Sequence, residues 1–226
     1  MELHDALRGT FAAREFTDAP LPDDVLWRIL DSARFAPSGG NRQGWRVIVV
    51  RDQATRDALA RLSAPAAKRY AAQLAAGENP WNSADPTAVS AETIARTPAP
   101  DRLTEPLRRA PVVLVVGVDL KVVASIDQYL PRVGVVSGAS VYPFAWNILL
   151  AARQEGFGGT ITTLAVAEEA AIRDLLGIPP HVAVCAVIPL GRPIRVLTKL
   201  RRKTVPEFAM RERWGGAPFS PAPCPS

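Results

Sequence analysis

The sequence predicts a single layered domain of the α/β type, in which helices cover both faces of a central sheet. Three segments, residues 45–50, 111–118 and 182–190, are apolar runs rich in β-branched side chains, interrupted only by Arg46 in the first. Such runs are typical of strands that are buried on both faces. Segments with helical spacing of apolar residues lie between these strands, and the length of 226 residues suits one domain.

The N-terminal part is expected to begin with a helix, a turn and a strand. Proline is favoured at the first position of a helix and acidic residues in its first turn, so Pro22 and Asp23 predict a helix start. The turn residues of segment 36–41 end this helix. Helices are therefore expected over residues 3–8, from residue 22 onward and over residues 53–62, with a strand over residues 45–50.

The segment 64–106 breaks this regular pattern. Residues 70–76 have helical character, but residues 77–101 are rich in Pro, Asn, Thr and Ser and are too long for an ordinary connection. We expect a variable, mobile excursion that acts as a lid over a site or a partner; a surface insertion without a role is the alternative. Trp81 is a candidate lid aromatic, with a packing role as its alternative.

The C-terminal half is expected to contain a long central helix, a last strand and a basic tail. The expected order is a helix over residues 135–155 that Pro143 kinks, a glycine-rich turn over 156–159, a short strand over 161–164, a helix over 167–176 and a strand over 182–190. Residues 207–214 are expected to form a helix or an arm. Residues 215–226 contain four prolines and are expected to be disordered, so the domain is assigned to residues 1–214.

The composition excludes several kinds of active site. The only cysteines are Cys185 and Cys224, and the only histidines are His4 and His181. This scarcity excludes a disulfide scaffold, a cysteine zinc site and a relay of several histidines. No nucleophile motif and no nucleic-acid recognition motif is present in the sequence, so we expect neither nucleophilic catalysis nor a nucleic-acid partner.

The chain carries a net charge of +5, and arginine far outnumbers lysine among its basic residues. Arginine suits bidentate phosphate recognition. The alternative is that most of the excess reflects a general bias in composition.

One segment has the length of a membrane span. Residues 133–152 carry no charge over 20 residues, which is enough to cross a bilayer. Serine, asparagine, glycine and proline dilute its apolar character, so a buried helix is expected instead. The first residues are polar and do not resemble a secretory leader, so we expect a cytoplasmic protein without a membrane partner.

Three loops carry residues that could bind a ligand. Segment 36–45 combines hydroxyl, amide and guanidinium groups with flexible glycines, a set that can read the edge of a flavin or a nucleobase; a plain turn is the alternative. The glycine-rich segment 156–160 could approach a ligand closely or could cap a helix. The basic run 199–203 could bind a phosphate or form a solvated surface.

Taken together, these segments resemble the nitroreductase family of FMN-dependent oxidoreductases. The most specific part is the sequence APSGGNRQ at 36–43, followed by Trp45. The helical and glycine-rich block at 143–159 and the sequence PLGRP at 189–193 follow in the order that the family has. The resemblance covers residues 5–214.

The resemblance implies an α+β fold, a three-layer α/β/α sandwich with a central, mainly antiparallel sheet, in an intertwined homodimer that holds FMN at its interface. It implies that NADH or NADPH gives a hydride to flavin N5, which passes it by a ping-pong mechanism to a nitroaromatic, a quinone or a similar small acceptor. The cofactor would carry the difficult chemistry. The alternatives are a flavin storage or sensor protein, and a flavin-fragmenting or reductive dehalogenase-like member of the family.

The resemblance also implies residue roles in cofactor binding. Arg14 would lie near the FMN phosphate or the pyrimidine edge of the flavin. The other implied contacts form three groups: Ser38, Gly39, Asn41 and Gln43 along the ribityl chain and the ring; Gly159, Thr162, Thr163 and Leu164 in the segment whose backbone N–H faces N5; and Arg201, Arg202 and Lys203 at the phosphate.

The sequence departs from the family pattern at two positions. Phe11 stands where the family usually has an arginine, and Gly44 where it usually has a proline. The loss of the arginine removes one expected phosphate contact, for which Arg8 is a candidate replacement.

Overall fold

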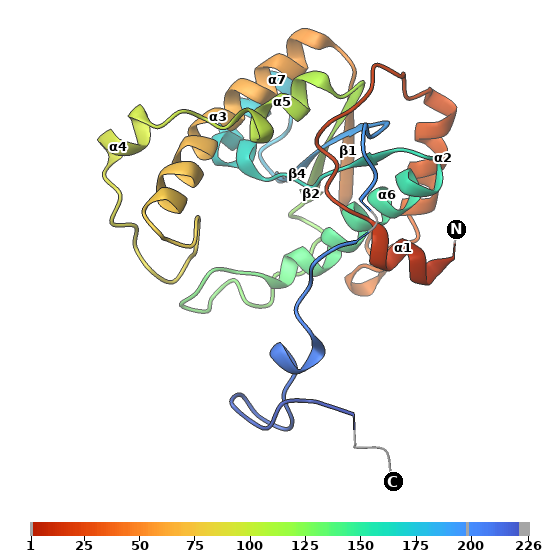
Figure 1. Cartoon of the computed structure of the whole chain (residues 1–226). Helices are drawn as coiled ribbons and strands as arrows, with labels where there is room; N and C mark the ends of the chain where they lie inside the picture. Colours follow the sequence, from red (N-terminus) through yellow and green to blue (C-terminus); the bar gives the residue numbers. More distant parts are fainter. Residues whose placement is uncertain (1, 198, 222–226) are drawn as a thin grey trace.

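The computed structural model describes residues 2–197 and 199–221, and within them four strands form one antiparallel sheet in the order β1-β2-β4-β3 (Figure 1). The strands are β1 (Trp45–Val50), β2 (Val112–Asp119), β3 (Gly158–Gly159) and β4 (Val182–Gly191). The three long strands lie within one residue of their predicted bounds. The α+β fold with an antiparallel sheet is therefore confirmed.

Helices precede, connect and follow the strands. The α-helices are α1 (Leu3–Gly9), α2 (Asp23–Ala33), α3 (Gln53–Ala75), α4 (Ala91–Arg96), α5 (Asp101–Arg109), α6 (Tyr142–Gln154) and α7 (Glu169–Leu176). Short 3-10 helices are η1 (Gly39–Asn41), η2 (Val136–Ser140), η3 (Leu164–Glu168) and η4 (Val205–Glu207). The expected helix start at Pro22 and Asp23 is confirmed, because Pro22 is the N-cap of α2.

The sheet lies between two layers of helices. Side chains alternate between the two faces of a strand, so the continuous apolar run of β2 supplies both layers. Leu114 and Val116 pack in the cluster that contains residues of α2 and α6. Val113 and Val115 pack in a second cluster, with residues of α3, α5 and α7 on the other face. This arrangement is the predicted three-layer sandwich.

Helix α3 is longer than its predicted range of 53–62 and continues through Pro65 to Ala75. A proline inside a helix removes one backbone hydrogen bond, and the sequence pattern was broken there. The helix nevertheless continues because its small side chains pack closely: Ala66 and Ala67, which directly follow the proline, are both buried. The segment 64–106 therefore contains the last part of α3, all of α4 and the first part of α5, and the irregular connections within it are shorter than expected.

The central helix starts later than predicted. Residues 136–140 form η2, and α6 begins at Tyr142, so Pro143 lies in its first turn. A proline there loses no helical hydrogen bond, and the predicted kink is wrong. Further along the chain, the expected strand over 161–164 is reduced to a single bridge between Thr162 and Val187. The next α-helix, α7, begins at Glu169, after η3.

The uncharged segment 133–152 is divided between η2 and α6, and Ile148 and Leu149 of α6 are buried in the core. The expectation of a buried helix is confirmed. Among the described residues, no helix has the length and apolar character needed to span a bilayer.

The C-terminal residues leave the body of the domain as an extended arm, drawn in blue below the sheet in Figure 1. We call residues 194–221 the C-terminal arm. Of the two alternatives for residues 207–214, the structure has the arm and not the helix: the described residues of the C-terminal arm contain η4 and a bridge between Met210 and Pro218. Phe208 and Trp214 are strongly exposed, Trp214 at 94%. Residues 222–226, with Cys224, lie outside the described residues.

We expect Ile148→Ala to lower the free energy of unfolding by about 2–5 kcal/mol, because it leaves a cavity between α6 and the sheet. Leu3→Ala, at a position 69% exposed on α1, is the control and is expected to cost about 0.5 kcal/mol or less. Urea unfolding of both variants measures the difference. Equal losses in the two variants would contradict the assignment of Ile148 to the core.

Candidate functional site

Two adjoining cavities near the end of the sheet share the side chains of Arg14 and Arg102. The smaller, of about 190 Å³, lies between α5, Tyr70 of α3 and residues 160–164. The larger, of about 290 Å³, lies between residues 11–15 and the start of the C-terminal arm, where it also includes Arg195. We call the two cavities together the basic cleft.

Arg14 reaches the cleft because its segment is pinned along the edge of the sheet. The Ala13 N–H donates to the Gly159 carbonyl at 2.9 Å, and the Thr17 N–H donates to the Arg192 carbonyl at 2.9 Å. Ala13 and Phe16 are buried, which leaves Arg14 directed outward between them. Burial first, and then the positive charge of Arg102, lower the pKa of the Arg14 guanidinium.

The cleft carries more positive than negative charge. Among the described residues, no carboxylate forms an ion pair with Arg14, Arg102 or Arg195. Glu15 lines the larger cavity as its one acidic side chain within the described residues. Guanidinium groups without carboxylate partners are a donor set for phosphate and other oxyanions. The donors of the basic cleft therefore fit the phosphate of FMN.

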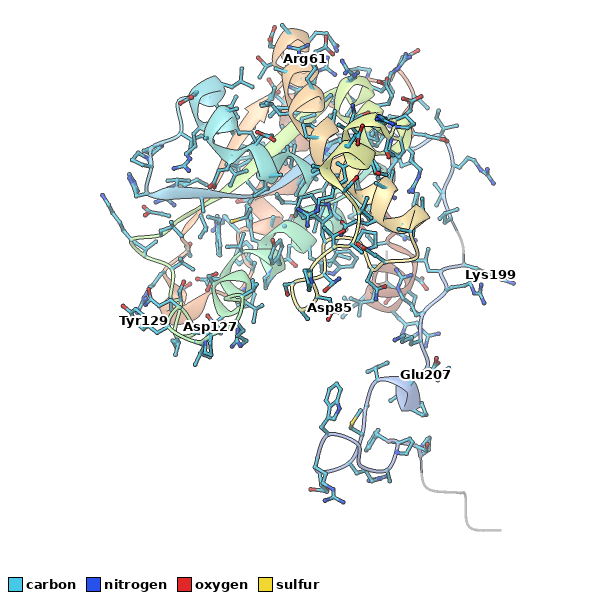
Figure 2. The ribbon with its side chains drawn as sticks, turned by 90° about the vertical axis from the view of Figure 1, so that its left-hand side faces the viewer. Arg61, Asp85, Asp127, Tyr129, Lys199 and Glu207 are labelled. Atoms are coloured by element: carbon cyan, nitrogen blue, oxygen red, sulfur yellow. The ribbon has the colours of Figure 1, made fainter. Side chains whose placement is uncertain are left out.

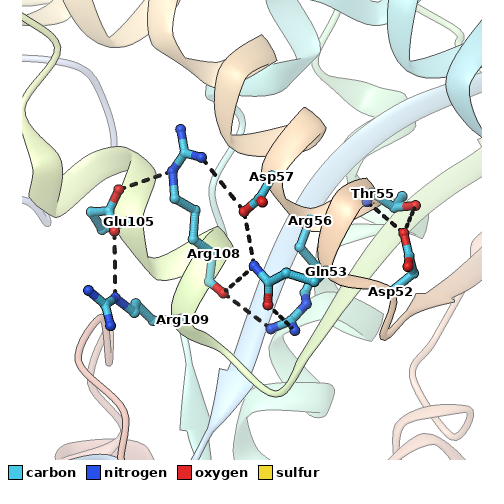
Figure 3. Close-up of polar contacts among 8 residues, drawn as sticks. All are labelled: Asp52, Gln53, Thr55, Arg56, Asp57, Glu105, Arg108 and Arg109. Atoms are coloured by element: carbon cyan, nitrogen blue, oxygen red, sulfur yellow. Dashed lines mark hydrogen bonds and ion pairs between the residues drawn. The ribbon is translucent and has the colours of Figure 1, made fainter.

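Helix α5, which carries Arg102, is fixed to the start of α3 by a network of polar contacts (Figure 3). The Arg108 side chain bridges Asp57 of α3 at 3.6 Å and Glu105 of its own helix at 3.0 Å. The Gln53 side chain donates to the Arg108 carbonyl at 3.3 Å and to Asp57 at 2.9 Å. These contacts set the position from which Arg102 enters the cleft.

Residues 160–164 form the opposite wall of the smaller cavity. Thr162 is held to β4 by a reciprocal pair of backbone hydrogen bonds with Val187, of 3.0 and 2.8 Å. The next residue, Thr163, is exposed, and its N–H makes no hydrogen bond to any described residue. This donor fits the implied role of the segment, which is to turn a backbone N–H toward a flavin. Thr162, Thr163 and Leu164 thus lie in one cavity with Arg14.

Gly159 has a packing reason to be glycine. A Cβ atom at this position would lie 2.4 Å from the Pro189 carbonyl oxygen, a distance that no side chain can accept. The close approach lets β3 pair with β4 and lets residues 12–13 bind to β3. Gly159 therefore supports the cleft through the backbone that it brings together.

The predicted block with Ser38, Gly39, Asn41 and Gln43 is well ordered but does not line the basic cleft. The Gln43 N–H donates to Ser38 Oγ at 3.0 Å, and the Gln43 side chain donates to Asn41 Oδ1 at 3.1 Å. Asn41 and Gln43 both have a positive φ, of 53° and 49°, so the turn is strained and locally fixed. Within a single chain, the block at residues 38–43 and the residues of the basic cleft therefore do not meet in one cavity.

A buried carboxylate supports this block from the neighbouring loop. Asp127, whose loop lies at the edge of the body together with Tyr129 (Figure 2), accepts from the Val135 N–H at 2.7 Å and from Arg132 at 2.7 Å. These contacts, the Val135 N–H first, lower the pKa of Asp127 to about 2. They hold the start of η2, whose Ser140 Oγ accepts from the Gly39 N–H at 3.0 Å.

The three basic residues predicted at the phosphate lie elsewhere. Arg201, Arg202 and Lys203 are exposed on the C-terminal arm and do not line the basic cleft. Arg8, the candidate replacement for the missing arginine, does not line it either. Arg102 and Arg195 line the cavities instead, and neither was among the residues predicted to bind the cofactor. Arg195 lies just before the basic run 199–203, whereas Arg102 lies in the segment 64–106, which was expected to be irregular, and has no motif around it.

A third cavity, of about 480 Å³, adjoins the basic cleft and shares Tyr70, Thr163 and Leu164 with it. We call it the aromatic pocket. It is lined by Ala66, Tyr70, Pro80, Trp81, Thr163, Leu164, Val166 and Ala167. A volume of this size and an apolar lining are typical of sites for small organic molecules.

Among the described residues, neither the free thiol nor the metal-ligating side chains form a competing site. Burial raises the pKa of the Cys185 thiol in β4 to about 11, which disfavours the reactive thiolate form at neutral pH. Within residues 2–197 and 199–221, no group of His, Cys, Asp and Glu side chains is arranged to hold a metal ion.

We expect Asp127 to make stability depend on acid pH. A carboxylate whose pKa is lowered on folding stabilises the protein above the pKa of the unfolded chain, near 4, and this contribution is lost as the pH falls toward 2. Asp127→Asn should therefore be less stable than the parent at pH 6, and the difference should shrink between pH 4 and pH 2. Urea unfolding over this range measures it, with the exposed Asp85→Asn as control. A difference that is constant with pH would contradict the role of the charge.

Comparisons with known proteins agree with this architecture. The sequence model of the Nitroreductase family matches residues 7–192. A protein of Archaeoglobus fulgidus named "Putative NADH dehydrogenase/NAD(P)H nitroreductase" is 31% identical over 182 residues, which cover 80% of this chain and 79% of that protein.

Two solved structures share the fold. One, from Desulfovibrio desulfuricans, is described as "a putative nitroreductase in complex with fmn"; it has a TM-score of 0.67, 21% identity and coverage of 95% of this chain and 98% of its own. The other, oxidised iodotyrosine deiodinase bound to FMN and 3-iodo-L-tyrosine, has a TM-score of 0.67, 19% identity and coverage of 94% and 100%. With the family match over most of its length, the chain belongs to the nitroreductase family.

Proposed function

We propose that this protein is an FMN-dependent oxidoreductase that moves a hydride from NADH or NADPH to a nitroaromatic, a quinone or a similar small acceptor. The observation that carries the proposal is the basic cleft, where Arg14, Arg102 and Arg195 form no ion pair with a carboxylate of the described residues. Arg14 and Arg102 share its smaller cavity with residues 160–164. Family membership and the FMN in two structures of the same fold support it. When bound, FMN supplies the hydride chemistry.

The residues of the chain would bind and orient this cofactor. Arg14, Arg102 and Arg195 would supply charged donors to the phosphate and to the edge of the ring. A cation at the ring edge stabilises negative charge that develops on reduction. Thr163 would offer its backbone N–H from the opposite wall, and Leu164 an apolar contact.

A second copy of the chain would complete the site. The block with Ser38, Gly39, Asn41 and Gln43 does not line the basic cleft of its own chain, and the C-terminal arm exposes large apolar side chains such as Phe208 and Trp214. We infer a homodimer in which each cleft receives this block from the partner and the arm packs on the partner. Arg201, Arg202 and Lys203 of the arm remain proposed phosphate ligands in that assembly.

One alternative stays within flavin chemistry. The fold shared with an iodotyrosine deiodinase makes a reductive dehalogenase the second candidate. It predicts that reduced protein releases halide from a halogenated phenol and leaves nitroaromatic compounds untouched. A flavin storage or sensor protein would bind FMN but would not oxidise NADH or NADPH with any acceptor.

The first test is an absorbance spectrum of the purified protein with added FMN, followed by anaerobic titration with NADH and then NADPH. We expect bound flavin that is bleached by at least one of the two donors and recovers its absorbance when a nitroaromatic compound or a quinone is added. A protein that does not bind FMN would contradict the proposal, and so would bound flavin that neither donor reduces.

The second test concerns the arginine that the sequence did not single out. A hydrogen bond to a charged group contributes about 1.5–3 kcal/mol, so Arg102→Ala is expected to weaken FMN binding by about 10- to 100-fold. Arg109→Ala is the matched control, because Arg109 lies on the same helix, is 79% exposed at its side chain and pairs with Glu105. Fluorescence titration with FMN measures both. Equal affinities in the two variants would remove Arg102 from the site.

A further inference from the structure

We propose that the aromatic pocket selects uncharged aromatic acceptors and excludes aromatic amino acids, and that Trp81 is its positioning residue. This inference rests on the proposed function, because it assigns the acceptor site of the same enzyme. It narrows the proposed class of acceptors to aromatic molecules that carry no charge.

The pocket lies where an acceptor would have to bind. Its wall shares Tyr70, Thr163 and Leu164 with the cavity that holds Arg14. A molecule in the aromatic pocket is therefore separated from the basic cleft by the Tyr70 side chain and one short stretch of backbone. The volume of about 480 Å³ accommodates a molecule of one or two aromatic rings.

Trp81 is held in a strained position in the wall of the pocket. Its φ is 59°, a conformation that a bulky residue adopts only where its surroundings enforce it. The Trp81 N–H donates to Oε1 of the buried Gln73 at 3.1 Å, and the indole Nε1–H donates to the Ala66 carbonyl at 3.3 Å. The Arg69 guanidinium lies 4.3 Å from the centre of the indole ring. These contacts fix the backbone of Trp81 and the orientation of its indole ring, and Arg69 covers one face of that ring.

The Glu78 carboxylate holds the loop around Trp81 together through three hydrogen bonds. Glu78 accepts from Thr87 Oγ1 at 2.7 Å, from the Ala88 N–H at 2.8 Å and from the Gln73 side chain at 3.0 Å. The hydrogen bond from Thr87, followed by that from Ala88, lowers the pKa of Glu78, so it stays ionised at neutral pH. The loop over 78–88 is therefore hydrogen-bonded to α3 through Gln73. These contacts hold Trp81 in a fixed position in the wall of the pocket.

The charges around the pocket decide what it can hold. Among the described residues that line it, none carries a carboxylate, an ammonium or a guanidinium group. Of the charged groups that pack against Trp81 and its loop, Glu78 is held in three hydrogen bonds, whereas Arg69 lies on the Trp81 ring and forms no ion pair with a carboxylate of the described residues. The ammonium group of an amino acid would lose water in the pocket without gaining a carboxylate partner, because the lining has none and Glu78 is already in three hydrogen bonds, and this loss is costly. An uncharged ring can instead stack on Trp81 and Tyr70.

Two probes with the same nitrophenyl ring test this selection. Binding of 4-nitrobenzamide, which is uncharged, and of 4-nitro-L-phenylalanine, which is zwitterionic, is measured by calorimetry on the full chain loaded with FMN. We expect the amide to bind at least about ten times more tightly, and its reduction in the presence of NADH to show a correspondingly lower KM. Equal or tighter binding of the amino acid would overturn the proposal.

The role of Trp81 is tested with three variants. Trp81→Ala is expected to weaken binding of 4-nitrobenzamide by about ten-fold and to raise its KM with little change in kcat, whereas Trp81→Phe restores most of the affinity. Trp27→Ala, which removes an indole 65% exposed on α2, is the control and should change neither.

Flavin reduction by NADH and the melting temperature are measured on the same variants. The proposed function fails if neither NADH nor NADPH reduces the wild-type flavin, and the calorimetric comparison still decides the pocket in that case. The assignment of Trp81 is overturned if Trp81→Ala binds 4-nitrobenzamide as tightly as the control variant does.

Discussion

The structure depends on one strand that is buried on both faces. β2 pairs with β1 on one side and β4 on the other, and its side chains supply both hydrophobic clusters. Because β4 is fixed in this way, its last residues can hold β3, and β3 in turn holds residues 12–13. Arg14 reaches the basic cleft at the end of this series of backbone pairings. The position of a surface guanidinium is thus set by the core.

The sequence was informative where one physical requirement dominates a segment. Burial on both faces leaves a continuous apolar run in β2, and the β-branched runs of β1 and β4 are nearly as distinct, so the bounds of the three long strands were predicted to within a residue. The two errors at Pro65 and Pro143 have a common cause. Proline weakens a helix locally, but packing of Ala66 and Ala67 outweighs this in α3, and a proline in the first turn of α6 breaks no bond. Packing between elements cannot be read from a local pattern.

The candidate site was predictable only in part, for a related reason. Arg14 and residues 162–164 lie in ordered segments that the family resemblance identified, and the structure brings them into one cavity. Arg102 enters the same cavity from a helix that lies far along the chain and has no motif. Its contribution depends on how α5 docks on α3, through contacts such as that between Arg108 and Asp57. Only a three-dimensional arrangement shows that such a residue faces the cleft.

The crowding of guanidinium groups in the basic cleft also affects the life of the protein before it meets any substrate. Burial, and then the neighbouring charge of Arg102, disfavour the charged form of Arg14, and a bound anion would offset this cost. A ligand that binds only the folded chain shifts the folding equilibrium in proportion to its concentration and affinity. The amount of intact protein in a cell would then follow the supply of its anionic cofactor, and newly made chains would last longest where that cofactor is abundant.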